Sequence, residues 1–197
     1  MAAMQPDNFP DIDTRTASVA RVYDHMLGGT DNYEVGRRAA DGMEDILLAA
    51  DKSTAFIEAD ASDTEQILSH PDTRRLINFG EPVAALYISF LHCIPDARDP
   101  KGVVGQMMNR LAPGSYLAIS HLTADDPQVR DKITGFILAA TGGHWGHVRS
   151  REEVAAFFDG QEIVPPGLVK VTDWRPDGRE EAQSPEWFEF GGVARKP

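Results

Sequence analysis

The positions of apolar residues along the chain predict helices first and strands later. In Val19–Met26, apolar residues recur at i, i+3, i+4 and i+7, which is the spacing of an amphipathic helix, and Gly28 follows as a stop signal. A second helix is predicted from Asp31 toward Ala50, with its apolar residues on one face. Beyond Lys52 the pattern changes to one typical of extended strands.

Nearly continuous apolar runs of strand length follow in three places, Thr54–Ala59, Val83–Ile94 and Ser115–Ser120. The run Val83–Ile94 is the longest, and it is typical of a strand buried on both faces. Two further strands are predicted at Leu168–Trp174 and Trp187–Ala194. Because a polar loop joins them, they are interpreted as an antiparallel hairpin.

Helix start signals separate most of these strands. The predicted cap residues are Asp63, Asp99, Asp126 and Ser150, the last with Glu153 three positions later as a capping box. Asp99 and Asp126 each precede a proline, which favours the first position of a helix. The alternation of strands and helices predicts an α/β fold with a mostly parallel sheet and an antiparallel C-terminal hairpin.

The composition is that of an ordinary globular protein, and it limits the partners. The chain has 197 residues, 42% of them hydrophobic and 25% charged, which is enough for a single domain with a sizeable core. The net charge of -12 repels polyanions, so we expect neither nucleic-acid binding nor attraction to anionic membranes. A small cationic or neutral ligand is compatible with this charge.

The single cysteine, Cys93, excludes a disulfide framework and a thiolate zinc cluster, and it favours a reducing cytoplasm. Residues 1–13 lack the features of a secretory signal, and no apolar run is long enough to span a membrane. The sequence therefore predicts a cytoplasmic protein.

Ligands of open parallel sheets bind outside the carboxyl ends of the strands, which directs attention to three segments. They are Asp60–Asp63, Phe90–Asp96 and Ser120–Asp125, and they include His92 and His121. Each histidine either takes part in chemistry or ends a strand with its hydrogen bonds satisfied.

Several common motifs are absent from the sequence. No two of the 17 glycines are separated by one residue, so the dinucleotide-binding pattern G-x-G-x-x-G does not occur, and neither a P-loop nor a G-x-S-x-G elbow is present. His144 and His147 have no carboxylate or thiolate placed in a recognised ligand pattern, so no metal site is predicted.

The segment Ala20–Tyr33, which reads Ala-Arg-Val-Tyr-Asp-His-Met-Leu-Gly-Gly-Thr-Asp-Asn-Tyr, resembles the opening signature of a family of S-adenosylmethionine-dependent methyltransferases first catalogued as a domain of unknown function. Similar segments follow at Phe56–Asp63, Ile67–Pro71, Leu91–Asp96, Leu111–Leu117, Ser120–His121 and Gly191–Pro197. The resemblance implies a Rossmann-like class I methyltransferase fold, S-adenosylmethionine as the cofactor and a small molecule as the methyl acceptor.

The chain departs from that family in one region. Members place a strand with a Gly-rich loop, and then a strand ending in an acidic residue, before the segment that begins at Phe56. Neither occurs here, so an internal deletion is expected near residues 46–52, with two strand–helix units of about 30 residues each missing. We expect residues 1–197 to form one truncated domain with a disordered tail at residues 1–13.

The resemblance also implies cofactor-binding residues. Asp60 with Ala61 corresponds to the acidic turn that accepts the adenine amino group. The other implied residues are Tyr23, Gly28, Gly29 and Asn32, which would cover the cofactor, and Ser89, Leu91 and His92, which would line its methionine end. The alternative for each is a role in the fold, as a core residue, cap or turn, and no catalytic base is identified.

Three functions are compatible with these observations. The first is methyl transfer to a small molecule. In the second, the fold is kept for binding or regulation while the cofactor binds weakly or not at all. The third is a nonfunctional deletion product.

With two strands missing, the remaining strands are expected in a new order. The predicted order is Thr54–Ala59, Val83–Ile94, Ser115–Ser120, Trp187–Ala194 and Leu168–Trp174. The Val83 strand is apolar enough to need a neighbour on each edge, and an edge left open would drive homo-oligomerisation.

Overall fold

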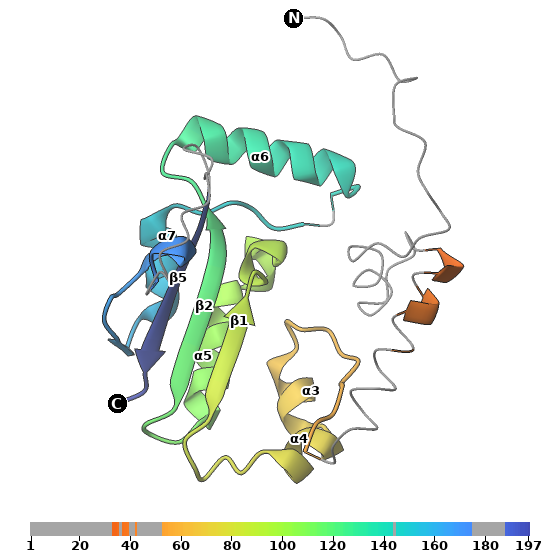
Figure 1. Cartoon of the computed structure of the whole chain (residues 1–197), viewed down its shortest axis with the longest axis vertical. Coiled ribbons are helices and arrows are strands. Elements are labelled where there is room, and N and C mark those ends of the chain that lie inside the picture. Colours follow the sequence, from red (N-terminus) through yellow and green to blue (C-terminus); the bar gives the residue numbers. More distant parts are fainter. Residues whose placement is uncertain (1–32, 36, 40–41, 43–52, 144, 175–187) are drawn as a thin grey trace, which may run out of the picture. The chain divides into compact units, whose positions relative to one another are not determined.

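A computed structural model describes residues 33–35, 37–39, 42, 53–143, 145–174 and 188–197 (Figure 1). The chain divides into two compact units, residues 1–58 and 59–197. In the first unit, residues 34–35, 37–39 and 42 are helical, within the helix predicted from Asp31. The helix predicted at residues 19–26, the tail at residues 1–13 and the junction near residues 46–52 lie outside the described residues.

The second unit is built on a five-stranded sheet with the order β1-β2-β5-β3, in which β4 also pairs with β5. The strands are β1 (Ala84–Ile88), β2 (Tyr116–Thr123), β3 (Glu162–Ile163), β4 (Val169–Lys170) and β5 (Phe188–Arg195). The predicted α/β class is confirmed, and so is the predicted order from the Val83 strand to the Leu168 strand.

The prediction of a mostly parallel sheet is wrong for the described strands. Only β1 and β2 pair in parallel, whereas β5 runs antiparallel to β2, β3 and β4. The reason is the position of β5: the last strand enters the sheet between β2 and the short strands, so each of its ladders is antiparallel. The expected C-terminal hairpin is present as the β4–β5 pair.

Helices connect and cover these strands at the predicted starts. They are α3 (Thr64–Ser69), α4 (Pro71–Leu76), α5 (Pro100–Arg110), α6 (Pro127–Ala140) and α7 (Arg151–Ala155). The carboxylates of Asp63, Asp99 and Asp126 each accept a hydrogen bond from a backbone N–H of the helix they precede. The capping box of Ser150 and Glu153 forms in both directions. Local hydrogen bonding at the helix starts was therefore predictable.

The predicted strands differ from the structure in three places. Thr54–Ala59 forms no strand, because a strand needs a paired neighbour for its backbone groups and β1 pairs only with β2 among the described strands. The run Val83–Ile94 divides into β1 and a 3-10 turn, η1 (Leu91–Cys93). Similarly, β4 is followed by the 3-10 turn η4 (Val171–Asp173).

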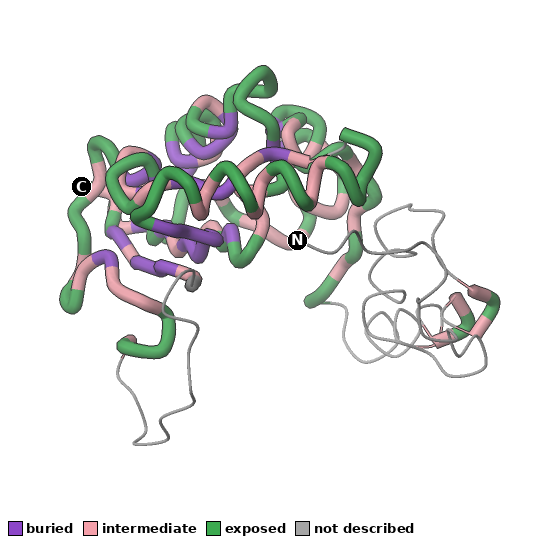
Figure 2. Tube along the Cα trace, turned by 90° about the horizontal axis from the view of Figure 1, so that it is seen from above, coloured by how far each residue is buried: buried purple, intermediate pink, exposed green. Residues whose placement is uncertain are grey.

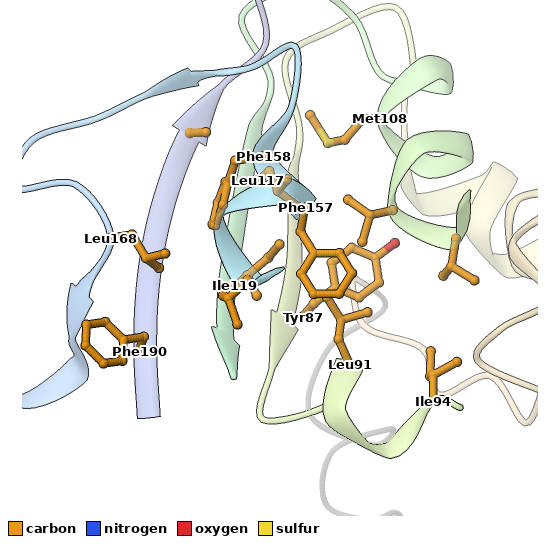
Figure 3. Packing of buried hydrophobic residues seen from close by; sticks show 14 of the residues in the cluster. Tyr87, Leu91, Ile94, Met108, Leu117, Ile119, Phe157, Phe158, Leu168 and Phe190 are labelled. Carbon is orange, nitrogen blue, oxygen red and sulfur yellow. The ribbon is translucent and has the colours of Figure 1, made fainter. Parts of the chain in front are cut away.

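The core lies on one face of the sheet (Figure 3). Tyr87 of β1 and Leu117 and Ile119 of β2 point to this face and pack against α5 and the 3-10 turn η3 (Ala156–Phe158). Leu117 and Ile119 are almost completely buried, and burying such a side chain stabilises the fold by about 1.5–3 kcal/mol. These positions belong to the buried segments coloured purple in Figure 2.

The opposite face of β1 is exposed within this unit. Leu86 and Ile88 are 67% and 57% exposed, and Tyr116, on the same face of β2, is 42% exposed. The prediction that the Val83 strand is buried on both faces is therefore wrong. Its apolar residues serve two different environments: Tyr87, Leu91 and Ile94 enter the core, while Leu86 and Ile88 do not.

Candidate functional site

A strained turn at the carboxyl end of β1 begins the candidate site. Ser89 has a φ of 50°, which is the left-handed region that residues other than glycine seldom adopt. Its N–H donates to the hydroxyl of Ser120 at 2.9 Å and to the Ser120 carbonyl at 3.2 Å. Such a conformation costs of order 1–3 kcal/mol, and it is found preferentially at functional sites.

The Ser89 turn brings two hydroxyls to one carboxylate. The Ser89 hydroxyl donates to Oε1 of Glu189, and the Ser120 hydroxyl donates to Oε2 at 3.1 Å. Ser120 is only 6% exposed, so its hydroxyl is fixed in position. Among the described residues, no basic nitrogen lies within 4.0 Å of the Glu189 carboxylate. We refer to Ser89, Ser120 and Glu189 as the serine–glutamate cluster.

His92 follows the same turn, and its ring is held by the backbone of β2. Its Nδ1 accepts a hydrogen bond from the Leu122 N–H at 3.2 Å, so in the neutral ring the proton is on Nε2. Burial lowers the pKa of His92, and the charge of Glu189 acts in the opposite direction. With Nδ1 occupied, the neutral ring offers a donor rather than a free basic nitrogen.

His121 is completely buried, and both of its nitrogens are engaged. Its Nδ1 donates to the Leu122 carbonyl at 2.7 Å, and its Nε2 accepts from Arg149 at 3.0 Å. Burial lowers the pKa of His121 to about 3, despite the opposing hydrogen bond to Leu122. Of the two interpretations of this histidine, the structure supports a core residue with satisfied hydrogen bonds.

Arg149 holds the segment that follows β1 in place. Its guanidinium, on a residue only 4% exposed, donates to the Leu91 carbonyl at 3.2 Å, forms an ion pair with Asp96 and lies 5.5 Å from the centre of the Phe157 ring. A buried cation is stable only when it is paired and hydrogen-bonded in this way.

Gly146 lets the neighbouring segment approach equally closely. A Cβ at this position would lie 2.5 Å from the carbonyl oxygens of His92 and Ile94, so only glycine fits. His147, two residues before Arg149, lies with Nδ1 3.6 Å from the Asp96 carboxylate. The segment containing His147 thus supports the turn after β1. Within the described residues no three His, Cys, Asp or Glu side chains are arranged to hold a metal ion.

Asp60 is already engaged by residues of its own unit. Its Oδ1 accepts from the Ser62 N–H at 2.9 Å and from the Ser62 hydroxyl at 2.7 Å, and its Oδ2 pairs with Arg98. The hydrogen bonds from Ser62, and then the one from Arg98, lower the pKa of Asp60 to about 2. Ala61 lies in the same exposed turn.

The predicted site residues are brought together only in part. Ser89 and His92 lie at the carboxyl end of β1, whereas the Leu91 side chain is fully buried in the core and only its carbonyl faces Arg149. The remaining four, Tyr23, Gly28, Gly29 and Asn32, lie outside the described residues, so their role stays a prediction.

Sequence reasoning missed Glu189 and Arg149. Each lies far along the chain from Ser89 and His92 and reaches the site only through the pairing of β5 with β2 and the bridge between Thr123 and Arg149. The one available signal for Glu189 is its place near the start of the last strand, which comes to the carboxyl end of β2 when the two strands pair antiparallel. Within the described residues, none of the helices has the length and hydrophobicity needed to cross a bilayer.

Comparison with known proteins identifies relatives over nearly the whole chain. The family model described as S-adenosyl methyltransferase matches residues 5–53 and 43–197. The two matched segments meet at the region where the sequence analysis places the missing strand–helix units.

Two solved structures resemble the chain closely in fold. A DUF574 family protein from Streptomyces avermitilis is 25% identical with a TM-score of 0.67, and the match covers 94% of this chain and 99% of that one. A protein from Thermobifida fusca assigned as a methyltransferase is 27% identical with a TM-score of 0.70, covering 92% of this chain and 95% of that one. No curated protein matches the chain.

Proposed function

Since the chain belongs to the S-adenosyl methyltransferase family, we propose that it acts on a small-molecule methyl acceptor bound at the carboxyl ends of β1 and β2. The observation that carries this proposal is the strained Ser89 turn, which directs two hydroxyls at Glu189. Ligands of open α/β sheets bind at this end. The net charge of -12 supports a small molecule rather than a nucleic acid or an anionic membrane as the partner.

The residues present do not fit S-adenosylmethionine as a complete site. The carboxylate of Asp60, which would accept the adenine amino group, already binds Arg98 and Ser62. In addition, the sequence has neither the Gly-rich loop nor the ribose-binding acid of the family. We therefore derive no transfer step, and we propose that the cofactor binds more weakly than in a complete relative.

A label-transfer experiment tests the proposed activity. The protein is incubated with methyl-labelled S-adenosylmethionine at high concentration and with a filtered pool of small metabolites, and heat-denatured protein is the control. Slow incorporation of label into the small-molecule fraction is the expected result. Incorporation no greater than in the control would refute methyl transfer.

A second function is favoured by the pairing of Asp60 with Arg98. If that ion pair keeps the cofactor out, the protein retains the family fold as a non-catalytic binding or regulatory protein. This function predicts that a small molecule binds at the Ser89 turn while no label is transferred, so the two measurements together separate the alternatives.

A further inference from the structure

We propose that the serine–glutamate cluster binds a protonated amine, so that the small molecule recognised at this end of the sheet is an organic cation. The inference rests on the proposed function, which places a small molecule here, and it adds the chemical class of that molecule.

The charge of Glu189 is the first argument. Other carboxylates in this unit have cationic partners, since Asp60 pairs with Arg98 and Asp96 pairs with Arg149. The Glu189 carboxylate, by contrast, receives two neutral hydroxyls and has no basic nitrogen within 4.0 Å among the described residues. An uncompensated carboxylate is best satisfied by a charged donor.

The remaining hydrogen-bonding capacity of the cluster points the same way. An ionised carboxylate accepts hydrogen bonds at about four lone-pair positions and donates none. Ser89 and Ser120 fill one position on each oxygen. An incoming group must therefore be a donor, and an ammonium group offers up to three N–H donors together with the opposite charge.

The surroundings disfavour an acidic ligand. Arg149 is buried and directed to Asp96, Leu91 and His121, so it offers no charge to a bound anion. His92 is neutral at pH 7, because burial lowers its pKa. The net charge of -12 further attracts cations and repels anions.

An apolar surface adjoins the cluster. Ile88, next to Ser89, is 57% exposed and is paired in register with Ser120, so its side chain lies on the same face of the sheet as that hydroxyl. A ligand with an ammonium group and an apolar body can therefore place the charge on Glu189 and the body against Ile88. This combination describes an aryl or alkyl amine.

The experiment compares benzylamine with benzyl alcohol, which has the same ring but carries no charge, in NMR titrations of the full chain without cofactor. We expect wild type to bind the amine roughly ten- to a hundredfold more tightly than the alcohol. Glu189→Gln should remove this difference, whereas Glu189→Asp, which keeps the charge, should retain a preference for the amine. Glu81→Gln, which alters an exposed carboxylate near the amino end of β1, is the matched control and should behave as wild type.

The outcomes separate this inference from the proposed function. Equal binding of both probes by wild type, or a preference for the amine that survives Glu189→Gln, would overturn the amine site and leave a ligand site at this end. Failure of both probes to bind wild type would overturn both. Because the readout is binding without cofactor, loss of methyl transfer has no effect on it. Thermal unfolding of each variant shows that the fold is intact, and Glu189→Asp still decides the question if the glutamine variant unfolds.

Discussion

The guanidinium of Arg149 connects the candidate site to the core. It satisfies the Leu91 carbonyl, the Asp96 carboxylate and Nε2 of His121 from a position that is almost fully buried. Groups left unsatisfied in the interior cost about 1–3 kcal/mol each. The position of the turn after β1 thus depends on a residue with no direct place in ligand binding.

Replacing this arginine tests its role. Arg149→Leu should lower the free energy of unfolding by about 1–3 kcal/mol, because the Leu91 carbonyl and the His121 ring each lose a donor. Urea unfolding measures the change. Arg110→Leu, at an exposed position at the end of α5, should change the free energy by less than about 0.5 kcal/mol. Equal effects of the two substitutions would contradict the role assigned to Arg149.

His121 predicts a pH dependence of stability. Its pKa is about 3 in the folded protein and about 6.5 in an unfolded chain, so the unfolded state binds more protons between these values. Stability should therefore fall as the pH is lowered from about 6.5 toward 3, with a slope from this residue of at most about 1.4 kcal/mol per pH unit.

Urea unfolding at pH 7, 6 and 5 measures this slope. His121→Gln, whose amide oxygen can still accept from Arg149, should be less stable at pH 7 but should lose much of the pH dependence. An unchanged slope in the variant would show that other groups are responsible.

Asp60 tests the cofactor-binding role implied by the family resemblance. If this carboxylate still contributes to the adenine subsite, Asp60→Ala should weaken S-adenosylmethionine binding further, by roughly tenfold for one lost charge-assisted hydrogen bond. Asp72→Ala is the matched control, because Asp72 is also exposed and also pairs with an arginine, Arg75. Calorimetric titration compares the two. Equal affinities would remove Asp60 from the site.

At the level of elements, helix starts were predictable and strand ends were not. The Asp63, Asp99 and Asp126 caps act within one turn of chain, so the sequence contains the whole interaction. The end of β1 depends instead on the Ser89 turn, whose hydrogen bonds come from Ser120, a residue on another strand. Apolar content alone could not show where Val83–Ile94 leaves the sheet.

The same distinction applies to the site. The rule that ligands bind at strand ends located Ser89 and His92, because both directly follow a predicted strand. Glu189 could be placed beside them only with the antiparallel register of β5 in hand. Thr54–Ala59 shows the opposite error, since a short apolar run gave no information on whether a partner strand exists.

The edge of β1 predicts self-association. Residues 84–88 of this strand, Ala-Ala-Leu-Tyr-Ile, carry no charge, and among the described strands β1 has a neighbour on one side only. Uncharged edges with exposed apolar side chains such as Leu86 pair readily with other chains. Light scattering should therefore give a mass above 21.6 kDa, and Leu86→Lys should reduce it. A stable wild-type monomer at micromolar concentration would contradict this prediction.

At the scale of the molecule, the chain combines a retained half with an incomplete one. The sheet around β2 and β5, the core beneath it and the serine–glutamate cluster are all present. The family match nevertheless falls into two segments that meet at residues 43–53, where the strands that would carry the Gly-rich loop and the ribose-binding acid are missing. Acceptor binding and cofactor binding are thus expected to have separate fates in this protein.

Calorimetric titration of the wild-type chain with S-adenosylmethionine tests this account most directly. The missing loop and acid remove several hydrogen bonds, each worth about 0.5–1.5 kcal/mol, so losing three weakens binding by roughly ten- to a thousandfold. We predict an affinity well below the micromolar range. Micromolar binding by wild type would show that the cofactor site is functionally complete, and it would contradict the central claim.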